Sequence, residues 1–113
     1  LIVTKVCIDE NNKIISFRSA LIFNNFSWDF LAATSKNGRK VYASYLSTWE
    51  LIKSCVEKKV KCYDMSGIDK KTNIGVYNFK KGTNSYEVKK LGLWQYSDNI
   101  FLRALIKIIA KIN

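Results

Sequence analysis

The spacing of apolar residues changes period near residue 43, and this change limits the folds that are open to the chain. Before it, β-branched and aromatic residues dominate three runs that predict strands, at residues 1–9, 14–23 and 26–33. Turn residues separate these runs, and Asn24-Asn25 is a hairpin-type signal. The first part of the chain therefore predicts an antiparallel meander, in which alternation places Phe26, Trp28 and Phe30 on one face.

A helical period follows a polar loop at residues 34–40. Residues 43–59 predict an amphipathic helix, because apolar side chains recur there at helical spacing. The members of this apolar stripe are Tyr45, Leu46, Trp49, Ile52, Val56 and Val60. Beyond the helix, the sequence predicts a strand at 61–65, a loop at 66–73, a helical turn at 74–80, a strand at 87–95 and a helix at 99–111 capped by Asp98 or Ser97.

The element order β-β-β-α-β-α-β-α limits the sheet topology. A strand, a crossover helix and a second strand form a parallel pair, whereas the first three strands form hairpins. We therefore expect an α/β (α+β) fold with a mixed, mainly antiparallel sheet and flanking helices. The length fits one domain over residues 1–113. Because the sequence enters a strand directly at Leu1, we expect it to be a piece of a longer protein.

The charge balance favours polyanionic partners. Lys and Arg number 19 against 9 for Asp and Glu, so the net charge is +10. Such an excess attracts nucleic acid, phosphorylated ligands or an acidic membrane surface, and a lysine-rich soluble surface is the alternative explanation.

The composition also excludes several chemistries. The chain contains no histidine, which rules out Ser-His-Asp and Cys-His catalysis and argues against a zinc site. A general base must then be a carboxylate, a tyrosine, a lysine or a group on the ligand. Three scattered cysteines suit free thiols in a reducing cytosol. The sequence has no signal peptide and no apolar run of about 18 residues, so we expect a cytoplasmic protein.

Three segments carry candidate binding or catalytic residues. In the loop before the long helix, Lys36, Arg39 and Lys40 would suit a phosphate at a helix N-terminus, although surface loops often have this composition. Tyr63 and Asp64 end a strand. Asp64 is a candidate for orienting a substrate amine or removing its proton, and a loop-capping aspartate is the alternative.

The third segment pairs lysines with aromatic residues. Lys80 and Lys81 follow Tyr77 and Phe79, and a partly desolvated lysine there would stabilise an oxyanion or hold a phosphate. Charge runs are more often solvated, so two surface lysines are the simpler interpretation from the residues alone. The final basic amphipathic helix would either pack on its own sheet or lie on a membrane.

Four stretches resemble the C-terminal part of the Fem family of peptidoglycan-bridge aminoacyltransferases. They are YLSTWELI (residues 45–52), CYDMSGI (62–68), GVYNFKKG (75–82) and EVKKLG (87–92), and the resemblance covers residues 13–96. It implies a partial GNAT-like acyltransferase fold. It also implies transfer of an amino acid from aminoacyl-tRNA to an amine of a lipid-linked or UDP-linked muropeptide, with no further cofactor and with contact at the inner face of the membrane.

The resemblance assigns roles to individual residues. The family's lysine corresponds to Lys80, expected near the acyl group in transfer, and Tyr77, Phe79 and Gly82 match its neighbours. Tyr63, Asp64 and Gly67 match a strand end that lines the same cleft. Residues 34–40 occupy the place of the acyl-CoA pyrophosphate loop of ordinary GNAT enzymes but lack its R-x-x-G-x-G/A pattern.

Two other functions stay open at this point. One is a GNAT N-acyltransferase that uses acyl-CoA on an amino sugar of a surface polysaccharide. The other is a basic fragment that binds RNA or an anionic surface without turnover.

Overall fold

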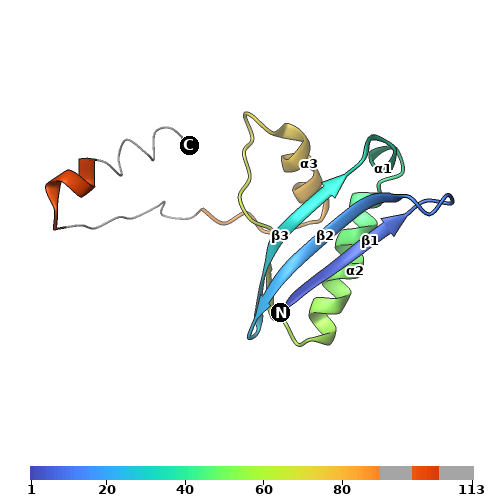
Figure 1. The fold of residues 1–113 in the computed structure, drawn as a ribbon, viewed down its shortest axis with the longest axis horizontal. Coiled ribbons are helices and arrows are strands. Elements are labelled where there is room, and N and C mark those ends of the chain that lie inside the picture. The colour runs from blue at the N-terminus through green and yellow to red at the C-terminus, as the bar shows by residue number, and fades with distance from the viewer. Residues whose placement is uncertain (90–97, 105–113) are drawn as a thin grey trace.

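The computed structural model describes residues 1–89 and 98–104, and its centre is one sheet with helices packed beside it (Figure 1). The elements, in chain order, are β1 (Ile2–Ile8), β2 (Ile14–Phe23), β3 (Phe26–Thr34), α1 (Lys36–Lys40), α2 (Ala43–Glu57), β4 (Cys62–Asp64) and α3 (Ile74–Gly82). The sheet order is β1-β2-β3-β4. β1, β2 and β3 are antiparallel neighbours, and β3 pairs with β4 in parallel. The predicted mixed, mainly antiparallel sheet with flanking helices is confirmed.

A bulge interrupts β3 in its middle. Ser19 of β2 faces Leu31, whereas the next residue, Ala20, faces Asp29, so Phe30 is an extra residue in β3. A bulge bends its strand and locally disturbs the ladder, and such irregularities are common beside functional sites. The alternation that predicted Phe26, Trp28 and Phe30 on one face is therefore broken at Phe30.

The helix α2 covers one face of the sheet (Figure 1), and most of its buried side chains are small. Its buried residues are Ala43, Ser47, Thr48, Leu51, Ser54 and Cys55. Ser47 Oγ lies 3.1 Å from Ser16 Oγ of β2, and Cys55 Sγ lies 3.8 Å from Ser27 Oγ of β3. Leu51 and Cys55 form the core with Ala20 and Ile22 of β2.

The expected apolar stripe of α2 was right only in part: Tyr45, Ile52 and Val60 are half-buried, and Val60 packs against the core. Leu46, Trp49 and Val56 are 55%, 60% and 66% exposed. Because small residues let a helix approach a sheet closely, the face with serine, threonine, alanine and cysteine packs inward. Leu51 is the one large apolar residue of α2 that is fully buried, whereas Trp49 and Val56 are exposed.

The segment between β3 and α2 also differs from the expected loop. Residues 36–40 form the short helix α1, whose N-cap Ser35 accepts a hydrogen bond from the Gly38 amide at 3.0 Å. Gly38 is buried, and a Cβ there would collide with the Ile15 carbonyl oxygen of β2. Tyr42 then takes a left-handed conformation (φ 56°), which separates α1 from α2.

The C-terminal predictions lie partly outside the described residues. Residues 87–89 are not in a strand, and residues 90–97 and 105–113, which hold most of the expected last strand and helix, are not described. Residues 100–104 are helical, and the Asn99 side chain accepts from the amides of Phe101 (2.9 Å) and Leu102 (3.4 Å). Asn99, rather than Asp98, thus caps this helix; Ser97 is not described.

Candidate functional site at the start of the β3–β4 divergence

The parallel pair β3–β4 is short, and the two strands separate where β3 bulges. Pairing runs only over Phe26–Cys62, Ser27–Tyr63 and Trp28–Asp64. β3 continues to Thr34, but the chain after Asp64 turns away. Strand ends that diverge in this way expose backbone groups and give space for a ligand.

A turn after Asp64 fixes the direction in which the chain leaves the sheet. Asp64 Oδ1 accepts from the Ser66 amide at 2.7 Å, and Ser66 has a left-handed backbone (φ 65°). The Ser66 hydroxyl donates to the Asp29 carbonyl oxygen of β3 at 3.1 Å. Asp64 therefore has the turn-forming role that was the alternative to chemistry, and a role toward a substrate stays a prediction.

A buried ion pair lies under this turn. Arg18 Nη1 of β2 lies 2.6 Å from Asp29 Oδ2 of β3, and the two side chains are only 9% and 12% exposed. The Tyr63 hydroxyl donates to the other carboxylate oxygen, Asp29 Oδ1, at 2.8 Å. Burial, and then the charge of Asp29, raise the pKa of the Tyr63 hydroxyl, so this group stays protonated as a donor.

The helix α3 packs on this pair through one aromatic residue. Asn73 caps α3 by accepting from the Val76 amide at 3.3 Å. Phe79 stacks on the Arg18 guanidinium (4.7 Å from its Cζ to the ring centroid) and against the Tyr45 ring of α2 (4.8 Å between centroids). These contacts place α3 beside β3, on the side away from β1 (Figure 1).

Lys80, which follows Phe79, is a buried lysine with fixed partners. It is 9% exposed, and its Nζ donates to the carbonyl oxygens of Gly67 at 2.7 Å and Ser66 at 3.3 Å. Burial is the largest influence on the pKa of Lys80 and lowers it. The negative charge of Asp29 raises this pKa, the positive charge of Arg18 lowers it, and the negative charge of Asp64 raises it. An ammonium has three donors, so two held by carbonyls leave one for a ligand.

We call Arg18, Asp29, Tyr63, Ser66, Gly67, Phe79 and Lys80 the α3 site. A partly desolvated ammonium beside diverging strands can bind a carboxylate or phosphate, or stabilise an oxyanion. The simpler interpretation of two solvated lysines was therefore wrong for Lys80. Lys81 is exposed, as that interpretation expects, and its role in substrate binding stays a prediction.

Two predicted residues of this region have more open surroundings: Tyr77, which is not part of the α3 site, and Gly67, which is. Tyr77 is half-buried, and its ring lies 5.2 Å from Lys70 Nζ, which in turn lies 2.9 Å from Glu87. Gly67 is exposed, and a Cβ there would meet nothing within 4 Å. Gly67 contributes its carbonyl to Lys80, and a role of either residue in substrate binding stays a prediction.

Lys36, Arg39 and Lys40, which we call the α1 basic cluster, have a different environment. All three side chains are exposed, and none forms an ion pair with another residue of segments 1–89 and 98–104. The long helix α2 follows, and its N-cap residue is Tyr42, whose side chain makes no capping hydrogen bond. Phosphate binding by this cluster stays a prediction.

The sequence predictions missed Arg18, Asp29 and Ser66. Arg18 lies within the apolar run IISFRSALIF, and Asp29 lies within FSWDFLAAT. A charged residue inside a run that otherwise predicts a buried strand is a signal of a buried ion pair. No comparable signal marked Ser66.

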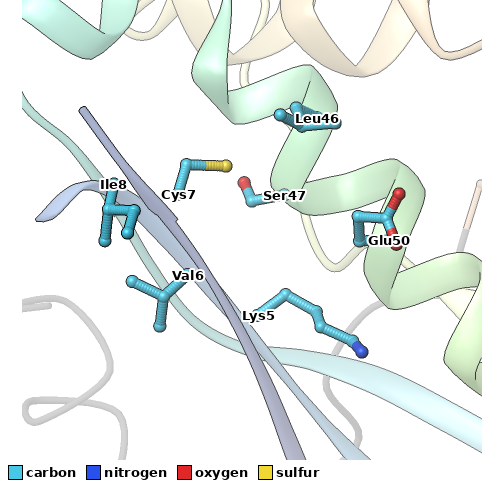
Figure 2. Close-up of a pocket in the computed structure, with 7 residues that line it drawn as sticks. All are labelled: Lys5, Val6, Cys7, Ile8, Leu46, Ser47 and Glu50. Carbon is cyan, nitrogen blue, oxygen red and sulfur yellow. The ribbon is translucent and has the colours of Figure 1, made fainter. Parts of the chain in front are cut away.

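A hollow of about 360 Å³ lies elsewhere, between β1 and α2. Its walls come from Lys5, Val6, Cys7, Ile8, Leu46, Ser47 and Glu50 (Figure 2). Figure 2 shows the Cys7 sulfur directed toward Ser47, while Lys5 and Glu50 lie at the side of the hollow. The hollow contains no residue of the α3 site.

Within the described residues, 1–89 and 98–104, no three His, Cys, Asp or Glu side chains are grouped to hold a metal ion. No helix in these residues has the length and apolar character of a membrane span.

The comparison with protein families decides the affiliation of the chain. A model of the FemAB family matches residues 4–111. The chain belongs to the FemAB family. The resemblance read from the four motifs is thereby confirmed, and the match extends it toward both ends of the sequence. No curated protein sequence matches this FemAB chain.

Solved structures show the same fold at low sequence identity. An acetyltransferase of the GNAT family from Staphylococcus aureus Mu50 is similar with a TM-score of 0.69 and 20% identity, over 87% of this chain and 63% of that chain. The tetramutant of the BH1408 protein from Bacillus halodurans is similar with a TM-score of 0.67 and 12% identity, over 84% of this chain and 66% of that chain. The FemAB chain thus has a GNAT-like fold and spans just under two-thirds of the length of these two proteins.

Proposed function

We propose that this FemAB chain takes part in acyl transfer, as an aminoacyltransferase that moves an amino acid from aminoacyl-tRNA to the amine of a peptidoglycan precursor peptide. The family match and the GNAT-like fold support the general class. The acceptor in this proposal is a lipid-linked or UDP-linked muropeptide, and the location is the cytoplasm at the inner face of the membrane. No cofactor beyond the tRNA co-substrate is needed.

The observation that carries the proposal is the environment of Lys80. Its ammonium is buried, yet two backbone carbonyls hold it in place. Such a preorganised donor stabilises charge that develops during a reaction and needs little rearrangement at that moment.

The reaction follows from ester chemistry. The acceptor's neutral amine attacks the aminoacyl ester carbon, a C–N bond forms, and the carbonyl electron pair becomes an oxyanion that accepts a hydrogen bond from Lys80 Nζ. The oxyanion then collapses, the bond to the ribose oxygen of tRNA breaks, and the proton lost by the amine balances the one gained by that oxygen. In this scheme Asp64 orients the amine, Tyr63, Tyr77 and Phe79 limit access of water, and Lys81 lies at the entrance.

The charge distribution supports a polyanionic donor. The net charge of +10 and the exposed α1 basic cluster favour tRNA phosphates. In this proposal the cluster binds the backbone of the acceptor stem, and the α3 site receives its aminoacyl end.

One observation favours a second candidate, an acyl-CoA-dependent N-acyltransferase that acts on an amino sugar. The similar structure from Staphylococcus aureus Mu50 is described as an acetyltransferase. A non-catalytic RNA-binding or anion-binding domain is the third candidate, because charge alone would support it.

Donor choice separates these candidates. The polypeptide encoded by the whole gene should be given labelled aminoacyl-tRNA with a UDP-linked muropeptide, and separately acetyl-CoA with an amino sugar. We expect the labelled amino acid to be transferred to the muropeptide amine, and we expect no acetyl group to be transferred to the amino sugar. Tight calorimetric binding of CoA together with acetyl transfer would replace the first candidate with the second, and tRNA binding without either transfer would favour the third.

A further inference from the structure

The α3 site contains a closed cycle of contacts that the proposed reaction does not by itself require. Lys80 donates to the Ser66 and Gly67 carbonyls, and the Ser66 hydroxyl donates to the Asp29 carbonyl. The Asp29 carboxylate pairs with Arg18, and the Arg18 guanidinium stacks on Phe79. Phe79 precedes Lys80 in α3, which closes the cycle.

The cycle holds Lys80 from two directions. Phe79 fixes the helix from which the lysine projects, and Ser66 fixes the carbonyls that receive its ammonium. Both constraints meet at Arg18 and Asp29, because the Arg18 guanidinium stacks on Phe79 and the backbone carbonyl of Asp29 accepts from the Ser66 hydroxyl. Displacing this pair would therefore move the lysine and its partners relative to each other.

Stability is a weak reason for burying such a pair. Removing two charges from water costs several kcal/mol, and replacing a buried pair by apolar residues is often neutral or stabilising. Tyr63 adds a third polar group, whose hydroxyl is committed to Asp29 at 2.8 Å. An apolar trio would fill the same space between β2, β3 and β4 without charge.

We propose that Asp29, held by Arg18 and Tyr63, is a positioning residue for Lys80 that fixes both the place and the charge of the ammonium. Burial disfavours the charged form of Lys80 and lowers its pKa; the charges of Asp29 and Asp64 favour the charged form, and that of Arg18 opposes it. These three charges come from β2, β3 and the end of β4. This inference rests on the proposed transfer reaction for its purpose, although its physical content does not depend on turnover.

Titration of Lys80 tests the inference directly. The chain would be prepared with lysine labelled with ¹³C at Cε, and the Lys80 signal assigned as the one absent from Lys80→Arg. The exposed neighbour Lys81 serves as the internal reference. Asp29→Asn should move the midpoint of Lys80 to lower pH, and Arg18→Gln should move it to higher pH, while Lys81 stays fixed. If the Arg18–Asp29 pair did not act on the charge of Lys80, the Lys80 midpoint would move in the same direction in both variants or would not move. Either result would overturn the inference.

The matched double variant tests positioning. Arg18→Met with Asp29→Leu removes the pair without leaving one charge alone, so the fold should survive. We expect transfer to fall roughly 100-fold, because small displacements in an active site have effects of this size. Full transfer by the folded double variant would overturn the positioning role. Should this variant fail to fold, the opposite shifts of the two single variants still decide.

The outcomes also separate this inference from the proposed function. Opposite shifts of the Lys80 midpoint in a protein that transfers no amino acid would support the coupling of Lys80 to Arg18 and Asp29, and would overturn the proposed transfer reaction. Unmoved midpoints in variants that retain full transfer would keep the reaction and remove the coupling.

Discussion

The α3 site and the α1 basic cluster both contain basic side chains, yet they differ in how the chain holds that charge. Lys80 is buried, has two carbonyl partners at 2.7 and 3.3 Å, and lies beside a buried ion pair. Lys36, Arg39 and Lys40 are exposed. A buried charge with fixed partners can interact with one atom of a ligand, whereas exposed charges attract a whole polyanion through a field that salt screens. The buried charge is suited to stabilising a reacting group, and the exposed charges are suited to attracting the substrate.

The largest expected effect distinguishes the two neighbouring lysines of α3. Lys80→Met should lower the rate of aminoacyl transfer by roughly 100-fold or more, the usual loss when one oxyanion donor is removed. Lys81→Met, one residue away and exposed, should leave the rate unchanged. Single-turnover transfer from labelled aminoacyl-tRNA measures both, with circular dichroism to check the fold. A folded Lys80→Met protein that transfers at the normal rate would show that the buried charge has no role in the chemistry.

Loss of the Tyr63 hydroxyl should have the next largest effect. Tyr63→Phe leaves Asp29 Oδ1 without its donor, so we expect a loss of about 1–3 kcal/mol in the free energy of unfolding at neutral pH. The pKa of Tyr63 is raised in the fold, so its stabilising contribution is complete below the ordinary value of 10.0 and declines as the pH rises above it.

The difference between wild type and Tyr63→Phe should therefore narrow at alkaline pH. Lys80, whose pKa is lowered, has the opposite effect on stability as pH rises, but it is present in both proteins and cancels in the difference. Urea unfolding at intervals from pH ~7 to ~11 measures this. A difference that is constant over the range would mean that the hydroxyl does not stabilise the fold through its protonated form.

The α1 basic cluster should affect binding rather than the chemical step. Changing Lys36, Arg39 and Lys40 together to Gln should weaken tRNA binding about tenfold. It should also lower the slope of log affinity against log salt, by up to ~0.9 for each phosphate that the variant no longer neutralises. The maximal rate of transfer should be unchanged.

The matched control for this cluster changes Lys58, Lys59 and Lys61, which are also exposed and lie at the other end of α2. We expect this second triple variant to keep most of its affinity for tRNA and its full maximal rate. Equal losses of affinity in the two triple variants would reduce the α1 basic cluster to a share of the general surface charge.

Local patterns predicted those parts of the fold that local physics decides. The bounds of β2 and the start of α2 agree with the sequence prediction, because alternation, turn residues and helical spacing act within a few residues. The resemblance of its motif to the family singled out Lys80, which the fold buries; the catalytic role of Lys80 stays a prediction.

The buried face of α2 and the ion pair were missed for a different reason. Whether Trp49 or Ser47 faces the sheet depends on the distance between the helix and the sheet. The spacing of residues along the helix gives no information about this distance. Arg18 and Asp29 meet only because the bulge at Phe30 shifts one strand against the other. Alternation within one strand carries no information about such a shift, so the partner of each charge could not be predicted from its own run.

The smallest effect compares two glycines of α3, and it tests how tightly the site is packed. At Gly82 an added Cβ would lie 2.5 Å from Tyr45 Oη, and Tyr45 in turn packs on Phe79. At Gly75 it would meet nothing within 4 Å. Gly75→Ala should therefore stabilise the chain by about 0.5–1 kcal/mol, the ordinary gain of alanine within a helix.

Gly82→Ala should instead destabilise by about 1 kcal/mol, because overpacking against Tyr45 exceeds that gain. It should also slow transfer, since a displaced Tyr45 ring moves Phe79 and with it Lys80. Adding Tyr45→Phe removes the nearest atom, so the double variant should recover stability and rate, and a double-mutant cycle measures the coupling. If Tyr45→Phe restores nothing, the contact at Gly82 does not transmit to Lys80, and the buried lysine then depends on the Arg18–Asp29 pair and the Ser66 turn alone.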